Sequence, residues 1–498
     1  MTMMRISSVW LLAALTVAGC SVTTDADLSS RVDLPEVFEN ASGQNPADAD
    51  SDTALWWRRW GDPELERVMR LALEGNLSLK TADLRIAEAD AYAKMADADR
   101  GPSAALGAAG GFGRTSVSSP VSLPFLPDRI SSSPRGAMGS VAASWEIDLF
   151  GRKQSDADVY AYRALGSRQQ RQAAEIEIAG RVAGAYFQMC AASEKRKLLD
   201  DSLKELDNLR RYIRGRFEAG QARAADLKRV ESEISHTASR ASALAAAEKN
   251  LRMTIAALAG QIPEGFEVVC GEKLPDYEHA PAAPAGVYPS DLLQRRPDLA
   301  AKQSEIRSLA AAHASAVAEL YPRLSLSFLW NTGALRISGD LEGVKGWGSA
   351  LGADLVLPLY TGGRIRAGID AADARLKAAL ADYDRRLLEA LAEVERGYSN
   401  LKAGADRQRK LVQALADARA LTSMLGKMFD LDAADYDRVV DAKLKEIGIR
   451  NEMLDAVLEY QQDLAGLFAS LGGGWDRPEQ AQGKQHGTDA MNRAEKSP

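Results

Sequence analysis

The sequence carries one pattern twice, and each copy includes a very long stretch without proline. These stretches run from residue 135 to 262 and from residue 359 to 477. Proline removes a backbone donor and breaks helices, so both stretches are free to form very long helices. Each is marked by a strand-like run that leads into a glycine and an arginine, Gly151-Arg152 and Gly363-Arg364. A repeated unit builds a repeated structure, so the duplication constrains the fold before any local signal does.

The composition favours helices over a thick core. Aromatic residues make up 6% of the 498 residues, and the apolar fraction depends heavily on alanine, which has the highest helix propensity. The formal net charge is -7, and acidic and basic residues are interleaved. Because no basic block is present, we expect no nucleic-acid partner.

The N-terminus has the features of a targeting segment. Residues 1–19 combine a short positive start with an apolar run too short to cross a bilayer, and they end in Val17-Ala18-Gly19-Cys20. This ending resembles the bacterial lipobox, which implies cleavage before Cys20, lipidation of that residue and, with Ser21 next, delivery to the outer membrane. The alternative is an ordinary secretory signal followed by a chance cysteine. We interpret residues 20–52, which are rich in Asp, Ser and Asn, as a tether.

The remaining chemistry of the sequence is sparse. Two further cysteines, Cys190 in a predicted helix and Cys270 in a linker, could pair in an oxidising periplasm, but we favour two free thiols, because two cysteines make no disulfide framework. Four scattered histidines and the lack of metal-ligand spacings indicate neither a metal site nor a cofactor. We find no nucleophile elbow, phosphate loop or paired-acid site, so an enzyme is not expected.

The two copies predict a first repeat at residues 53–270 and a second at 290–474, joined by a linker at 271–289. A polar tail at 475–498 is expected to be disordered. Each repeat is predicted to contain a helix, two strands, a long helix and a returning helix. The predicted helices cover residues 63–100, 152–214, 222–260, 364–428 and 435–471, with a further helix that starts at 290 or at 296–297 and ends near 320. The predicted strands cover 104–116, 137–149, 324–331 and 347–360.

The strands and the long helices suggest different surroundings. Strands of about ten residues have the length of tilted bilayer-spanning strands, but a membrane barrel needs about eight or more strands to close. Four strands therefore predict that copies of the chain share one barrel, with twelve strands for three copies. Two water-soluble hairpins that cap a coiled coil are the alternative. The helices after the strands carry charge throughout, so we expect them to project into water as hairpins that together line a tube.

The order and spacing of several motifs resemble the TolC-like outer-membrane efflux channels, specifically their lipoprotein branch. The most specific motifs are residues 145–152, Arg295-Arg296-Pro297-Asp298-Leu299 and residues 357–364. The resemblance implies an α+β membrane protein: a homotrimer with a twelve-stranded outer-membrane barrel and a long α-helical periplasmic barrel. It also implies two partners, a periplasmic adaptor protein and an inner-membrane pump.

The family's hairpin-tip motif matches the second repeat at Phe429 and at Val439-Val440-Asp441-Ala442, with Asp432 in place of the family glycine. The first repeat keeps Phe217 and Gly220. The resemblance implies that Asp441 lies at an acidic constriction and Phe429 at a gating aromatic position. Asp435 and Arg438 are further candidates for contacts at this aperture. The alternative for Asp441 is a solvated helix carboxylate.

Aromatic residues near the strands have two interpretations, an aromatic girdle at the membrane interface or packing between strands and helices. They are Trp145, Phe328, Trp330, Trp347 and Tyr360. Near the N-terminus, Trp56, Trp57 and Trp60 are expected to pack as a collar rather than bind a ligand.

The leading functional hypothesis is a passive duct in the outer membrane that conducts drugs or other small toxic compounds from a pump to the exterior. Alternatives are the outer-membrane component of a type I protein secretion or metal efflux system, and a non-conducting coiled-coil lipoprotein. Few histidines and no methionine clusters give no indication of metal.

Overall fold

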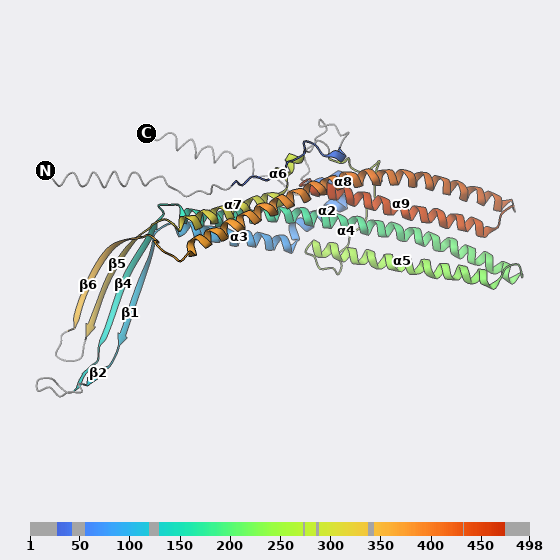
Figure 1. Cartoon of the computed structure of the whole chain (residues 1–498). Coiled ribbons are helices and arrows are strands. Elements are labelled where there is room, and N and C mark those ends of the chain that lie inside the picture. Colours follow the sequence, from blue (N-terminus) through green and yellow to red (C-terminus); the bar gives the residue numbers. More distant parts are fainter. Residues whose placement is uncertain are drawn as a thin grey trace. The chain divides into compact units, whose positions relative to one another are not determined.

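The computed structural model describes most of the chain (Figure 1). The described residues are 27–41, 55–118, 129–271, 274–284, 288–336, 343–431 and 433–473. They form two compact units, a strand unit with residues 86–166 and 302–382, and a hairpin unit with residues 30–85, 167–301 and 383–473. The predicted signal peptide at 1–19, Cys20, Asp432 and the tail at 475–498 lie outside the described residues.

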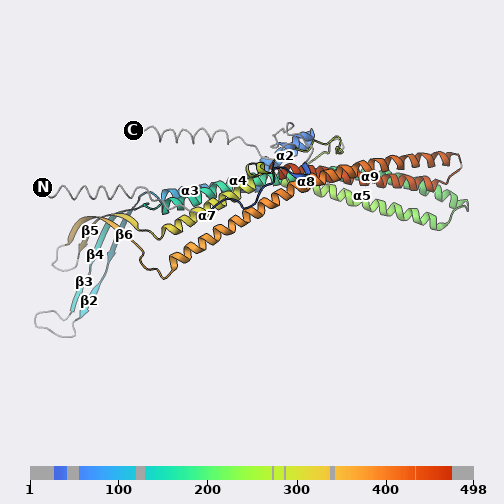
Figure 2. The ribbon, with the colours of Figure 1, turned by 45° about the horizontal axis from the view of Figure 1, so that its top comes forward.

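The long helices repeat with identical lengths. Helices α4 (Arg152–Glu218) and α8 (Arg364–Asp430) each have 67 residues, or about 100 Å at 1.5 Å per residue. The returning helices α5 (Ala224–Leu258) and α9 (Tyr436–Ser470) each have 35 residues. In two views α5 runs beside α4 and α9 beside α8 as helical hairpins (Figure 1, Figure 2). The helical hairpins predicted from the proline-free stretches are therefore present.

The shorter helices differ between the repeats. They are α2 (Pro63–Gly75), α3 (Leu77–Ala98), α6 (Leu292–Arg295) and α7 (Pro297–Ala318). The prediction of a single helix over residues 63–100 is wrong, because the helix is interrupted at Asn76. The Asn76 side-chain oxygen accepts hydrogen bonds from the backbone N–H groups of Ser78 and Leu79, at 2.8 and 3.2 Å, and so caps the start of α3.

One antiparallel sheet forms the centre of the strand unit, with strand order β1-β4-β5-β6. Its strands are β1 (Ser103–Phe112), β4 (Arg135–Ile147), β5 (Arg323–Arg336) and β6 (Val344–Val356). A separate short pair, β2 (Thr115–Ser118) with β3 (Arg129–Ser132), was not predicted. The four long strands agree with the prediction, and β1 and β6 are the two edges of the sheet.

The register gives this sheet one apolar and one small polar face, because paired residues share a face. Leu326 lies between Trp145 and Ala353, and Phe328 between Ala143 and Leu351. One position along, Ser327 lies between Ser144 and Gly352 on the other face. The alternation is typical of a strand with apolar surroundings on one side and water on the other.

Aromatic side chains pack together in the core of the hairpin unit. The short 3₁₀ helices there are η1 (Glu39–Ala41), η3 (Trp56–Trp60) and η4 (Pro289–Asp291). Trp56 is fully buried and stacks on Phe468 with ring centroids 5.9 Å apart. The Trp60 ring lies 5.6 Å from that of Phe187 on α4. The predicted packing role of the tryptophans is confirmed.

The expectation of two free thiols is wrong, because Cys190 and Cys270 form a disulfide across 80 residues. Tyr186, one turn before Cys190 on α4, donates a hydrogen bond to the Asp62 carboxylate at 2.7 Å, and its oxygen accepts one from the Gly271 N–H at 3.5 Å. These contacts bring the segment after α5 against α4. Sequence spacing alone does not reveal such a contact.

Among the described helices we find none that is long and apolar enough to cross a membrane.

Candidate functional site at the hairpin tips and the Arg296 cluster

Both hairpins turn with the same backbone hydrogen bond. In the first, the N–H of Gln221 donates to the oxygen of Arg216 at 2.7 Å, and in the second the N–H of Ala433 donates to the oxygen of Met428 at 2.7 Å. Gly220 takes a left-handed backbone with φ of 73°, as this type of helix end requires. The two tips therefore share this hydrogen bond, while Asp432, at the position equivalent to Gly220, lies outside the described residues.

Phe429 lies in an aromatic cluster with two tyrosines. Its ring centroid is 5.2 Å from that of Tyr436 on α9 and 6.1 Å from that of Tyr212 on α4. The two tyrosine rings are 4.9 Å apart. The cluster thus joins the first hairpin to the second at their tips, and sequence reasoning missed both tyrosines.

An apolar core supports this cluster. Val440 on α9 is fully buried and packs with Leu209, Ile213 and Val230 of the first hairpin. Its neighbour Asp441 is exposed, so the Asp441 carboxylate lies on the side of α9 away from that core. The motif residues Val440 and Asp441 consequently have different surroundings.

Asp435 is brought to the first hairpin by Arg216. An Arg216 guanidinium nitrogen lies 3.4 Å from the Asp435 carboxylate and 3.5 Å from the Tyr212 hydroxyl. The hydrogen bond to Tyr212, followed by the nearby Asp435 charge, raises the pKa of Arg216. Arg438, in contrast, is exposed, and its backbone N–H donates to the Asp437 carboxylate at 3.0 Å. The structure therefore groups Phe429 and Asp435 with Arg216, but not Asp441 or Arg438.

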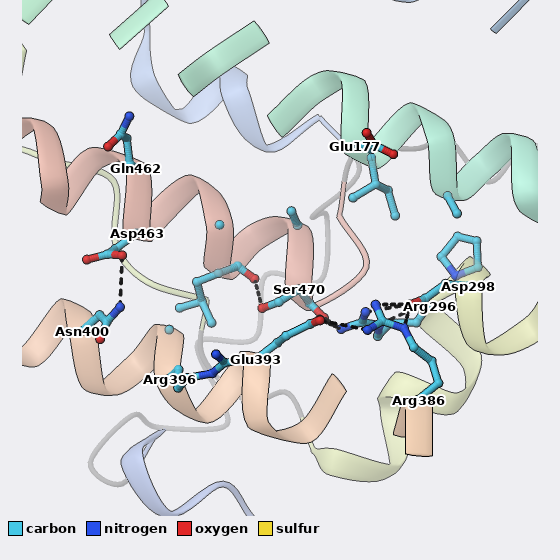
Figure 3. Close-up of a pocket in the computed structure, with 17 residues that line it drawn as sticks. Glu177, Arg296, Asp298, Arg386, Glu393, Arg396, Asn400, Gln462, Asp463 and Ser470 are labelled. Carbon is cyan, nitrogen blue, oxygen red and sulfur yellow. Dashed lines mark hydrogen bonds and ion pairs between the residues drawn. The ribbon is translucent and has the colours of Figure 1, made fainter. Parts of the chain in front are cut away.

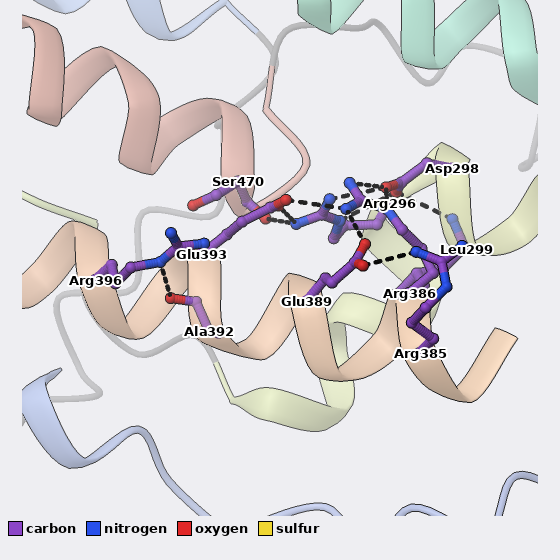
Figure 4. A network of polar contacts seen from close by, with 10 residues as sticks. All are labelled: Arg296, Asp298, Leu299, Arg385, Arg386, Glu389, Ala392, Glu393, Arg396 and Ser470. Atoms are coloured by element: carbon purple, nitrogen blue, oxygen red, sulfur yellow. Dashed lines mark hydrogen bonds and ion pairs between the residues drawn. The ribbon is translucent and has the colours of Figure 1, made fainter. Parts of the chain in front are cut away.

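A second polar site surrounds Arg296, whose side chain is only 7% exposed (Figure 3). Its guanidinium binds both carboxylate oxygens of Asp298, at 3.0 and 2.8 Å, and one oxygen of Glu393 at 2.7 Å. Arg386 on α8 also contacts these two acids, at 2.8 Å from Asp298 and 2.9 Å from Glu393 (Figure 4). Two arginines and two carboxylates therefore form one network. The sequence places Arg296 and Asp298 in a family motif at the start of a predicted helix, and it does not indicate their contacts with α8.

The network keeps Asp298 ionised. Burial opposes the charged form, but hydrogen bonds and charge from Arg296 and Arg386 outweigh it and lower the pKa of Asp298 to about 2. A groove of about 620 Å³ lies beside the network, and Glu177, Asn400 and Asp463 are among the residues that line it. Asn400 and Asp463 are hydrogen bonded across it at 3.2 Å (Figure 3).

Four of the five predicted girdle aromatics share the apolar face of the sheet. Trp145 pairs with Leu326, and Phe328 and Trp330 lie two and four positions after Leu326 on the same strand face. Trp347 pairs with Thr332, the next residue on that face after Trp330. Tyr360 lies beyond β6 and is 91% exposed. The Trp145 indole donates to the backbone oxygen of Arg100 at 2.9 Å.

Comparison with known proteins identifies a family. The chain matches the family described as "Outer membrane efflux protein" over residues 68–261 and 288–473. Outer membrane protein OprJ of Pseudomonas aeruginosa is 29% identical, with 94% of this chain and 95% of that protein covered. The pyoverdine export outer membrane protein OpmQ of the same organism is 27% identical, with 96% and 99% covered.

Solved structures agree with the family match. The outer-membrane channel OprN superimposes with a TM-score of 0.79 at 25% identity, and covers 92% of this chain and 100% of its own. The Campylobacter jejuni CmeC outer membrane channel has a TM-score of 0.80 at 18% identity, and covers 94% and 98%. The predicted fold class, that of trimeric channels with four strands per chain and long helical hairpins, is confirmed.

Proposed function

Because the chain belongs to the outer membrane efflux protein family, we propose that it is the exit duct of a tripartite efflux system in the outer membrane. In this role it conducts substrates passively, and an inner-membrane pump with a periplasmic adaptor delivers them. The observation that carries the proposal is a sheet with one apolar face and two open edges, joined in the same chain to charged helical hairpins too long for a compact core.

The strands support a shared barrel. Strand edges do not face lipid, because the bilayer core offers no hydrogen-bond partners. Strands β1 and β6 each pair with only one strand within this sheet, and side chains on their apolar face, such as Leu106 and Leu351, are more than 80% exposed. Three copies that pair β6 of one chain with β1 of the next make a closed barrel of twelve strands.

The duplication supports the same assembly at the tips. Leu209 and Tyr212 on α4 pack against α9, whereas Leu421 and Met424, 212 residues later on α8, are exposed. The counterpart of α9 in the first repeat is α5. If α8 packs as α4 does, it contacts α5 of a neighbouring copy. Alternating hairpins from three copies then close a ring of helices.

In such a ring the second hairpin forms the periplasmic aperture. Three Asp441 carboxylates around a narrow opening repel one another and attract cations, as acidic rings do in channels. Phe429, Asp435 and Arg438 belong to the same tip. The contact of Arg216 with Asp435 holds the second tip against the first, and so favours the closed form.

Membrane attachment is proposed to use both the barrel and a lipid on Cys20. The girdle residues on the apolar face, with Tyr360 beyond the sheet, then lie near the lipid headgroups. Relatives named for pyoverdine export and for cation efflux differ in cargo, so the pump is proposed to select the substrate. For this chain we favour drugs or other small toxic compounds.

The assembly is tested by measuring the mass of the detergent-solubilised protein by light scattering, with its electrophoretic migration before and after heating. We expect three chains per particle and heat-dependent migration. Met424→Glu places a charge in the proposed contact and should weaken the trimer. Ser423→Glu, on the adjacent exposed position, should not. A monomeric wild-type particle would refute the shared barrel.

A further inference from the structure

The segment between the repeats is fastened at one end to the first hairpin. We call the described residues 270–271 and 274–284 the inter-repeat strap. Cys270 is joined to Cys190 on α4, and the N–H of Gly271 donates to the Tyr186 hydroxyl at 3.5 Å. One covalent bond and one weak hydrogen bond therefore attach the strap to α4.

The other end of the strap is fastened to the second hairpin. The Gln461 amide on α9 donates to the oxygen of Pro275 at 2.5 Å, and the Gln408 side-chain oxygen on α8 accepts from the N–H of Tyr277 at 3.0 Å. Further along, the hydroxyl of Tyr398 donates to the oxygen of Pro284 at 2.7 Å. All three hydrogen bonds use strap backbone, so the sequence pattern does not reveal them.

These contacts hold the strap firmly because the groups that make them are buried. Gln408 and Gln461 are fully buried. Gln461 also accepts from the Trp60 indole at 2.6 Å, and Gln408 donates to the oxygen of Ala456 at 3.2 Å. Release of the strap would leave the buried Gln461 amide donor without the Pro275 oxygen and the buried Gln408 amide oxygen without the Tyr277 N–H. Leaving buried polar groups unpaired is unfavourable.

We propose that the inter-repeat strap is a covalently locked crossbar that fixes the spacing of the two hairpins at the level of Cys190. Motion that opens the tips is then confined to the part of the hairpins beyond it. On α4 this part runs from Cys190 to Glu218, or about 40 Å at 1.5 Å per residue. We call the level of Cys190 the pivot of this motion. The statement that the tips open about this pivot rests on the proposed function, whereas the crossbar itself does not.

The lock forms by oxidation and resists reduction. A disulfide oxidant of the periplasm takes up two electrons and two protons from the thiols as the sulfur–sulfur bond forms. Cys190 is 3% exposed, while Cys270 is partly exposed. An incoming thiolate therefore attacks Cys270 and must expel the Cys190 thiolate into a buried, apolar site, which slows exchange. The bond thus acts as a durable lock.

The crossbar is tested by hydrogen exchange on the intact, detergent-solubilised protein, with and without a water-soluble phosphine. The phosphine is oxidised to its oxide as the disulfide gains two electrons and two protons, and alkylation followed by mass measurement confirms two free thiols. We expect exchange of residues 274–284 to rise at least about tenfold, with β1 unchanged. Unchanged exchange in the strap of fully reduced protein would overturn the crossbar.

The pivot is tested by single-channel recording of the same oxidised and reduced samples, so no substitution is needed. Reduced channels should open more often. Equal opening frequencies, in a sample whose strap exchange has risen, would overturn the pivot. Protein that never conducts would contradict the proposed function instead, and would leave the exchange result standing. A Cys190→Ala, Cys270→Ala double variant should behave as the reduced protein does.

Discussion

Arg296 donates a hydrogen bond to the backbone oxygen of Ser470, the last residue of α9, at 3.0 Å. Asn76 makes the same contact in the first repeat, from its amide to the oxygen of Leu258, the last residue of α5, at 2.7 Å. Both residues immediately precede a helix and are buried. The repeats therefore fasten the end of each returning helix in the same way, with a neutral amide in one and a charged network in the other.

Removal of the charge at Arg296 should destabilise the hairpin unit strongly. Arg296→Met leaves Asp298 and Glu393 with Arg386 as their remaining partner, so we expect a loss at the low end of the roughly 3 to 5 kcal/mol that breaking a buried ion pair costs. Denaturant unfolding followed by circular dichroism measures the change. Arg58→Met removes an exposed pair with Glu66 and serves as a control with little expected effect. Equal midpoints for both variants would contradict the structural role of the network.

The same network predicts a dependence of stability on pH. The pKa of Asp298 is lowered to about 2 from an ordinary value of 3.8. The folded state thus binds this proton less tightly than the unfolded state does. Its stabilisation, about 2 kcal/mol, is complete above pH 4 and is lost as the pH falls through 2. The stability difference between wild type and Asp298→Asn should stay constant above pH 5 and shrink below pH 4. A difference that is flat down to pH 2 would refute the shift.

A glycine substitution tests the close packing where the second hairpin ends. Gly472 has φ of 81°, and an added Cβ would lie 2.5 Å from the backbone oxygen of Arg295. Gly472→Ala should therefore lower the free energy of unfolding by more than about 1 kcal/mol. Gly426→Ala on α8, where nothing lies within 4 Å, should raise it by about 0.5 to 1 kcal/mol. Thermal unfolding of both variants gives the comparison, and two changes of the same sign would disprove the argument.

The contact between Arg216 and Asp435 should affect the tips without affecting overall stability. Both side chains are more than a third exposed, so the pair adds little to folding. Arg216→Ala and Asp435→Ala should each increase the frequency of channel opening, and the double variant should add little more, because one contact is lost in all three. Additive effects of the two substitutions would show that the residues act separately.

Much of the fold follows from local pattern. The proline-free stretches and the glycines at the turns predict the long helices, and alternation around Leu326 and Phe328 predicts the strands. Asn76 escaped prediction because helix-favouring residues continue on both sides of it, which outweighs the weak stop signal of Gly75-Asn76.

The candidate site was only partly predictable. Phe429 and Asp435 could be assigned to a tip from the motif, but their partners Tyr212 and Arg216 lie more than 200 residues away. Separations of 97 and 80 residues likewise hide the contact between Arg296 and Glu393 and the pairing of Cys190 with Cys270. Contacts between distant segments depend on how the repeats pack, and a single sequence does not contain that information in its periodicity.

The central claim is that three copies form a duct whose aperture is the tip of the second hairpin. Single-channel recording in planar bilayers tests it most directly, with wild type compared with Asp441→Asn, which removes the carboxylate charge at nearly constant volume. We predict a conducting trimer with low, cation-selective conductance in wild type and reduced cation selectivity in Asp441→Asn. No conductance from wild type, Asp441→Asn or Arg216→Ala would contradict the duct, and unchanged selectivity in Asp441→Asn would contradict the aperture.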